Sequence, residues 1–281
     1  MSKRFNNNNN NNDSDKRMKF NNNNNNNNNR NNNNSKDTAS LESQIKDTEI
    51  ISLFKGFSQK LDEDNDRRER IVKISRDITI SSKRLISLLQ RACWENKQDI
   101  IVQAKEDLDK IHLLFGTIIT ELNNQEYWKF QRSFTWGVQE YIESFSFLYF
   151  LENGTLIPLD YIHNSIKESL KLESLGQFSI SMEDYYLGLA DLTGELMRYS
   201  TNSTTQKKYD DCYQICDFVR VIHSGFSLCH LNRDLNSKLN LIDESLKKIE
   251  KLCFSIRVRG SEFPDQIMFG LDGGEQQQET N

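Results

Sequence analysis

The chain has 281 residues, of which 27% are charged, and a formal net charge of −5. This acidity argues against a protein that coats DNA through bulk positive charge. No apolar stretch approaches the roughly 20 residues of a membrane-spanning helix, and no secretory signal is recognisable, so no membrane association is expected. The five cysteines are odd in number, which favours a reducing intracellular compartment over a disulfide-linked fold.

The first 40 residues differ in composition from the rest of the chain. They contain asparagine runs at 6–12, 21–29 and 31–34 and almost no apolar side chains. Such a segment buries too little surface to offset its ordering entropy, so we expect residues 1–40 to be disordered. Its basic clusters, at 3–4 and 16–19, have the spacing of a bipartite nuclear import signal; charges that only keep the segment in solution are the alternative. Residues 41–264 are expected to form one helical domain, and 265–281 a flexible tail.

Apolar spacings of three and four residues dominate the predicted domain, and the whole chain has only two prolines. These features predict an all-α fold. The expected helices cover about 48–92, 97–122, 124–152, 158–170, 182–201, 206–231, and a seventh that starts near Leu235 and ends at Gly260 and Pro264. The seventh repeats apolar residues every 3.5 positions on average, which is typical of helices packed along a long bundle. We therefore expect an elongated seven-helix bundle, with a loop at 171–181.

Two acidic pairs are the main candidates for chemistry. Glu140 and Glu143 share one face of the third helix, and Asp191 and Glu195 share one face of the fifth. Four carboxylates brought together would repel and desolvate one another unless a cation neutralised them. Such oxygen ligands suit Mg²⁺ or Mn²⁺, which can activate water and stabilise a phosphodiester transition state. Acidic pairs at helical spacing also occur on ordinary solvated faces, and the pattern alone leaves that alternative open.

Other clusters also have two interpretations. Trp136, Phe147 and Phe150 lie on the same stripe as the two glutamates, where they would either stack bases or pack in the core. Four cations of the first helix lie within about 60° of arc, and they form either a ridge that follows RNA phosphates or a solvated face. These cations are Arg70, Lys73, Arg84 and Arg91.

Two other metal sites are disfavoured. A di-iron bundle requires Glu-x-x-His on two helices, and no histidine here has a glutamate three residues before it. A zinc site would use the Cys212, Cys216, His223 and His230 face of the sixth helix, but these positions spread over roughly 27 Å. Packing in the core or against a subunit is favoured instead.

The aromatic content predicts a partner. Sixteen Phe, nine Tyr and three Trp exceed what the interior of one such bundle is expected to hold. We expect a partner surface on the sixth helix, with Cys212, Cys216, Phe226 and His230, and on the Phe-rich third helix.

Four segments resemble the translin-associated factor X branch of the translin family. They are RERIVKISRDITISSKRLISLLQR at 68–91, GVQEYIESFSF at 137–147, DYYLGLADLTGELMR at 184–198 and RVRGSEFP at 257–264. The resemblance runs from about residue 48 to 264. It implies a seven-helix translin-type fold, a hetero-oligomeric barrel with a translin-like subunit, and a location in cytoplasm and nucleus. It also implies Mg²⁺-dependent endonuclease action on single-stranded RNA, with DNA as a further ligand. The implied substrates are passenger-strand fragments of RNA silencing and remnants of tRNA processing.

The resemblance also assigns roles to residues. The acidic motifs of that branch match Glu140 and Glu143 in QEYIE and Asp191 and Glu195 in DLTGE. Translin-like sequences lack the glutamate pair on the third helix, which places this chain on the catalytic branch. Glu143 and Glu195 are expected to bind Mg²⁺ directly, and Glu140 and Asp191 to complete the shell or orient the attacking water. The alternative function is a non-catalytic scaffold that binds translin and nucleic acid.

Overall fold

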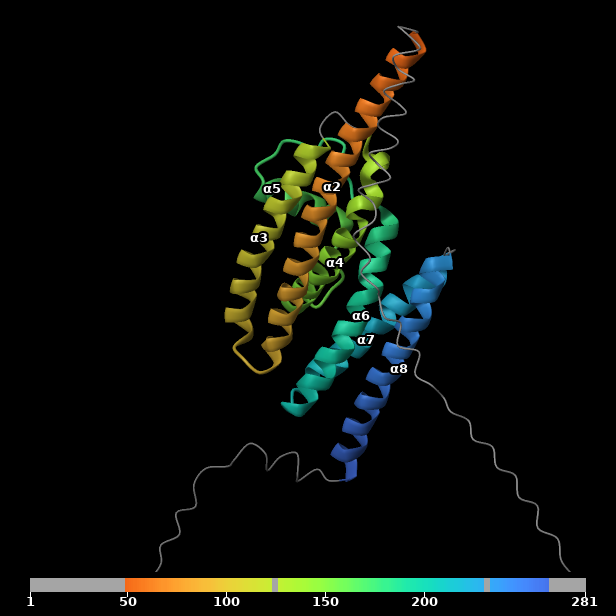
Figure 1. The fold of residues 1–281 in the computed structure, drawn as a ribbon. Coiled ribbons are helices and arrows are strands. Elements are labelled where there is room, and N and C mark those ends of the chain that lie inside the picture. The colour runs from red at the N-terminus through yellow and green to blue at the C-terminus, as the bar shows by residue number, and fades with distance from the viewer. Residues whose placement is uncertain (1–48, 123–125, 230–232, 263–281) are drawn as a thin grey trace, which may run out of the picture. The chain divides into compact units, whose positions relative to one another are not determined.

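The computed structural model describes residues 49–122, 126–229 and 233–262. These residues form seven α-helices and one short 3₁₀ turn and contain no β-strand, which confirms the all-α fold. In chain order the elements are α2 (Glu49–Gln90), η1 (Arg91–Cys93), α3 (Lys97–Glu121), α4 (Tyr127–Asn153), α5 (Leu159–Ser169), α6 (Met182–Thr205), α7 (Tyr209–Leu228) and α8 (Arg233–Glu262), as Figure 1 shows. The predicted tail at 1–40, the segment 265–281 and Pro264 lie outside the described residues.

The helix ends follow local chemistry. Ser181 caps α6 by accepting a hydrogen bond from the backbone N–H of Asp184, which satisfies one of the N–H groups left free at a helix start. The helix α4 ends at Asn153 because Gly154 adopts a left-handed conformation with φ of 68°. The helix α6 continues four residues past its predicted end. The helix α8 contains Gly260 and ends at Glu262, so the prediction that Gly260 ends this helix was wrong.

The described residues divide into two units, one that ends at Leu61 and one that starts at Asp62. In the second unit, α6 packs against α4 and α8, and α7 packs against α6 and α8. The predicted apolar stripe of α8 is buried, including Ile242, Ile249 and Ile256. In the first unit, the described part of α2 has an apolar stripe that is 57–67% exposed. This stripe consists of Ile50, Leu53, Phe54, Phe57 and Leu61.

Close approach between α4 and α6 depends on a glycine. An ideal Cβ at Gly188 of α6 would lie 2.7 Å from the Cβ of Ile142 and 2.8 Å from the carbonyl oxygen of Gln139, both on α4. Any larger residue would therefore push the two helices apart. Because α4 carries Glu140 and Glu143 and α6 carries the other acidic pair, this crossing sets how close the two pairs come.

For the residues that the structure describes, the prediction of a partner surface on the sixth and third predicted helices was wrong. Cys212, Cys216 and Phe226 of α7 are at most 2% exposed, and the phenylalanines of α4 are buried within the chain. His230 lies outside the described residues. Because α6 and α8 both cover α7, the apolar face of α7 is used inside the chain.

Candidate active site

The two glutamates of α4 and Glu195 of α6 line one cavity of about 310 Å³. The remaining wall is formed by three residues near the end of α2 and by Arg198 of α6. These lining residues are Lys83, Ile86, Ser87 and Arg198. Asp191 does not line the cavity. The packing of α4 on α6 thus brings together three of the four predicted carboxylates at a single opening.

Three of the four carboxylates are held by donors from the chain itself. Lys83 Nζ lies 3.0 Å from an oxygen of Glu140. Lys238 of α8 forms an ion pair with Asp191. These two contacts come from helices distant in the sequence, and each partly neutralises one acid.

Glu195 is positioned mainly by Gln90, a buried side chain at the last residue of α2. The Gln90 amide nitrogen donates to Glu195 Oε2 at 2.7 Å and to the Glu195 backbone carbonyl at 3.0 Å. Arg198 Nη1 lies 3.6 Å from the same carboxylate oxygen. Both contacts with the carboxylate fall on Oε2, so the described neighbours leave Oε1 for a ligand in the cavity.

Glu143 differs from the other three acids. It makes no hydrogen bond or ion pair with any residue that the structure describes. Burial, followed by the negative charges of Asp191, Glu140 and Glu195, raises the pKa of Glu143 to about 8, and Lys238 opposes the shift. At neutral pH this side chain therefore needs either a proton or a cation from outside the chain.

The carboxylates do not form a preformed metal cage. In the described part of the chain, no three Asp, Glu, His or Cys side chains lie close enough together to hold one ion. Lys83 and Lys238 lie beside Glu140 and Asp191 and neutralise these two acids in place of a metal ion. The Cys212 and Cys216 face of α7, within the same described ranges, likewise forms no such metal cluster. The Cys212 thiol donates to the Ser200 carbonyl at 3.2 Å.

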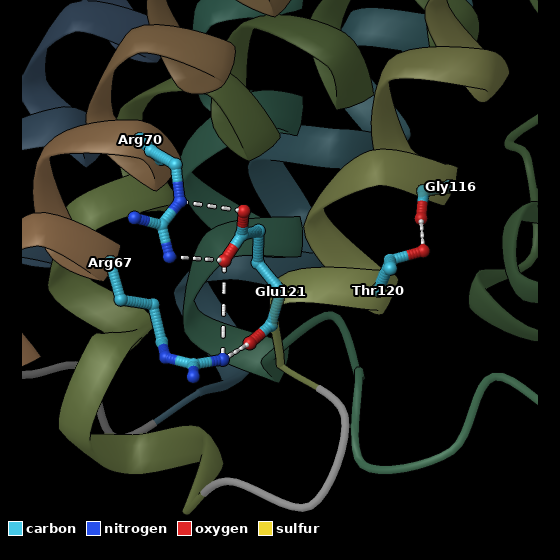
Figure 2. A network of polar contacts seen from close by, with 5 residues as sticks. All are labelled: Arg67, Arg70, Gly116, Thr120 and Glu121. Carbon is cyan, nitrogen blue, oxygen red and sulfur yellow. Dashed lines mark hydrogen bonds and ion pairs between the residues drawn. The ribbon is translucent and has the colours of Figure 1, made fainter. Parts of the chain in front are cut away.

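The predicted basic ridge is partly paired. Figure 2 shows Arg70 and Arg67 converging on Glu121 at the end of α3, with Arg70 Nε 2.8 Å from Glu121 Oε1. Arg91, which lies in η1 beyond the end of α2, pairs with Glu95 at 2.7 Å. Lys73 and Arg84 are exposed. A role of this ridge in RNA binding stays a prediction, in which Arg70 and Arg91 would have to exchange a carboxylate for a phosphate.

The three aromatic residues of the predicted stripe separate into two environments. Phe147 packs edge-on against Tyr199 of α6, and Phe150 lies 4.4 Å, centroid to centroid, from Phe218 of α7. Both are therefore core residues, and stacking on RNA is excluded for them in this fold. Trp136 is 74% exposed and remains available for contact.

Sequence patterns missed the residues that surround the acids. Lys83 lies in the motif at 68–91, but no spacing rule links it to Glu140, 57 positions later. Gln90 and Lys238 carry no local signal, since a lone Gln or Lys at a helical position is ordinary. Only the register between helices shows that they contact the acidic residues.

Comparisons with known proteins identify the family. The model of the Translin family matches residues 66–260. The chain belongs to the translin family. It is 34% identical over 238 residues to translin-associated protein X of Pongo abelii, covering 78% of this chain and 82% of that protein. It is 26% identical over 220 residues to translin of Homo sapiens, and the match covers 76% of this chain and 93% of that protein.

Solved structures of translin-family proteins share the fold. The crystal structure of apo-NeC3PO matches with a TM-score of 0.56 and 21% identity, covering 74% of this chain and 98% of that one. The structure of an AfC3PO–duplex RNA complex also matches with a TM-score of 0.56, at 17% identity, covering 73% and 96%. In this family member, no helix in the described ranges is long and apolar enough to cross a membrane.

Proposed function

We propose that this chain is the catalytic subunit of a translin-containing, Mg²⁺-dependent endoribonuclease. The observation that carries the proposal is Glu143, a half-buried carboxylate without a partner among the described residues, placed in a cavity beside two further carboxylates. Burying such a group is costly unless the charge is compensated. A divalent cation supplied with the substrate would provide that compensation.

The side chains present fit Mg²⁺ better than a metal that requires a complete protein cage. Magnesium usually keeps several waters and binds through one or two carboxylates together with substrate phosphate oxygens. Glu143 and the free oxygen of Glu195 would supply two ligands from two helices, so three convergent protein ligands are not required. Mn²⁺, with the same preference for oxygen, is the alternative ion.

The other residues of the cavity can then be given roles. When bound, the metal supplies charge stabilisation at the phosphodiester and a more acidic bound water. Glu140 lines the cavity and can accept a proton from the attacking water, whereas Asp191 does not line the cavity and is better suited to hold Lys238. The water oxygen forms a bond to phosphorus while the bond to the leaving oxygen breaks, and the leaving oxygen takes a proton from solvent or from Lys83.

A translin-like partner subunit follows from similarity to translin-associated protein X, whose name states its association with translin. The exposed apolar stripe of α2 at residues 50–61 supports a partner requirement, because such a stripe is unfavourable in water. We place single-stranded RNA first among substrates, with DNA as a further ligand, although a structure of AfC3PO contains duplex RNA. Cytoplasm and nucleus are the proposed locations.

The test is co-expression with a translin-like subunit, followed by cleavage of single-stranded and duplex RNA in Mg²⁺ or in chelator. Glu143→Ala is expected to abolish cleavage while the complex still assembles. Glu152→Ala is the matched control, because Glu152 also lies on α4 but pairs with Lys105 at 2.6 Å outside the cavity. Normal cleavage by the Glu143 variant would overturn the site.

The second candidate is a non-catalytic scaffold that binds translin and nucleic acid. One observation favours it: Lys83, Lys238 and Arg198 already neutralise most of the acidic cluster. A self-neutralised cluster has less need of a metal. Under this hypothesis the wild-type complex binds RNA and leaves it intact in Mg²⁺, a result that the same assay would reveal.

A further inference from the structure

The first half of α4 exposes two tryptophans and one arginine at regular spacing. Trp128 is 71% exposed and Trp136 is 74% exposed, and Arg132, midway between them, is also exposed. From Tyr127 to Tyr149 these three are the only exposed residues of the helix, since every other position is buried or half-buried. Positions four residues apart lie on one helix face. We call Trp128, Arg132 and Trp136 the tryptophan stripe.

The tryptophan stripe leads into the acidic cavity. Glu140 follows Trp136 by one further step of four residues and lines the cavity. The helix rises about 1.5 Å per residue, so Trp136 lies about 6 Å along the axis from Glu140. An elongated ligand on the stripe would therefore continue directly to the carboxylates.

Positive charge accompanies this path. Arg132 has no carboxylate partner among the described residues. Lys83 stands beside Glu140 at the cavity, and Arg76, seven positions earlier on α2, is exposed on nearly the same face of that helix. Ser75, the residue before Arg76, has its backbone oxygen 2.8 Å from an ideal Cβ at Gly137, the residue after Trp136, so α2 and the stripe come close at this point.

We propose that the tryptophan stripe binds single-stranded RNA and guides it into the acidic cavity. The two rings stack on bases, and Arg132 contacts a phosphate between them. Proteins bind single strands in this way, by splaying bases onto aromatic rings beside a basic groove. The inference rests on the proposed nuclease function and adds the path by which the substrate reaches that site.

The geometry of the stripe suits a single strand better than a duplex. Trp128 and Trp136 are eight residues apart, which is about 12 Å along the helix. Stacked bases within a duplex strand are only about 3.4 Å apart and shield their faces from protein side chains. Two rings at this separation match bases that have been unstacked from one another.

RNA is also a better occupant than a second protein. Protein interfaces also use tryptophan and arginine, but the core of such an interface is apolar, whereas Gln131, Arg132 and Ser133 between the two rings are all polar. The exposed apolar stripe at residues 50–61 of α2 has that continuous character and the tryptophan stripe does not.

The experiment measures RNA binding by the full chain assembled with a translin-like subunit, in chelator so that nothing is cleaved. The probe is a fluorescein-labelled oligouridylate, read by anisotropy. Trp128→Ala and Trp136→Ala are each expected to weaken binding by roughly 5- to 100-fold, the range for loss of one base stack. Trp136→Phe should retain most of the affinity. Trp94→Ala is the matched control, because Trp94 is 51% exposed but follows η1 and is not on α4.

Arg132→Ala gives a second, independent measurement. Loss of a phosphate contact should weaken binding and make the dependence of affinity on salt less steep by about one charge. Unchanged affinity in both tryptophan variants would overturn the proposal. So would loss of the partner subunit from the Trp136→Ala complex in sedimentation, because that outcome would make the stripe a protein interface.

The two proposals fail in different ways. If the chain is a scaffold and not a nuclease, the wild type produces no Mg²⁺-dependent cleavage, yet the tryptophan variants still lose affinity. If the tryptophan stripe does not bind RNA, cleavage by the wild type persists and the binding curves of the variants coincide with it. Full melting curves for each variant confirm that the exposed substitutions leave the fold intact.

Discussion

Replacing Glu143 by Gln should change how the stability of the metal-free protein depends on pH. The carboxyl of Glu143 has its pKa raised from an ordinary 4.5 to about 8, first by burial and then by the neighbouring acids. Folding therefore favours the protonated form. The stability contributed by this proton is fully present below pH 4.5 and is lost as the pH rises through about 8. Glutamine keeps the shape of the side chain and cannot ionise, so the variant escapes that loss.

The size of the effect follows from the pKa difference. At about 1.4 kcal/mol per pKa unit, the interval from 4.5 to about 8 sets an upper limit of about 5 kcal/mol. Glu143 opens on a cavity that water can enter, and this screening lowers our expectation to about 2–3 kcal/mol. The Gln variant should thus match the wild type near pH 4 and exceed its free energy of unfolding by that amount near pH 9.

Urea denaturation of the assembled complex in chelator, across this pH range, measures the difference directly. Groups that titrate equally in both proteins cancel, which isolates Glu143. Adding Mg²⁺ at pH 8 should then raise the melting temperature of the wild type and have little effect on the Gln variant, because only a carboxylate binds the ion well. Parallel pH profiles for the two proteins would refute the assignment of Glu143 as a half-buried, uncompensated acid.

Three further predictions concern the fold, the N-terminal segment and the partner. Gly188→Ala should cost about 1–3 kcal/mol in urea unfolding and reduce cleavage, because its methyl group would strike Ile142; Gly194→Ala, with open space at its Cβ, should be neutral or slightly stabilising, and equal behaviour of the two variants would contradict the close crossing. Deleting residues 1–40 should leave the melting temperature and cleavage unchanged and reduce nuclear accumulation of a fluorescent fusion, whereas a large drop in melting temperature would show that the segment is structural. The chain purified alone should aggregate or unfold, as judged by sedimentation with and without a translin-like subunit; a well-behaved monomer that cleaves RNA would refute the partner requirement.

The sequence by itself determined where the helices lie and which acidic residues share a helix face. Residues three or four apart must share a helix face, so the pairing of Glu140 with Glu143 and of Asp191 with Glu195 followed from spacing alone. The apolar repeat of α8 was predictable for the same reason, because helical periodicity is a local property of the backbone. The fifth helix was expected to start near residue 182, and α6 begins at Met182.

The tertiary structure decided which neighbours these faces meet. Trp136, Phe147 and Phe150 lie on one stripe of α4, yet the two phenylalanines are buried and the tryptophan is exposed. Their positions around the helix are nearly the same, but Tyr199 of α6 packs on Phe147 and Phe218 of α7 packs on Phe150, whereas Trp136 stays 74% exposed. A helical wheel records an angle and contains no information about what lies beside each turn.

The same limit applies to the acidic cavity. Lys83 from α2 and Lys238 from α8 partner two of the acids, and Glu143 is left without a partner among the described residues. That difference depends on the register between helices, which is fixed by close packing such as the approach at Gly188. Four similar carboxylates in the sequence thus become one high-pKa group and three compensated ones only when the helices are packed, because burial and charge proximity are properties of the assembled fold.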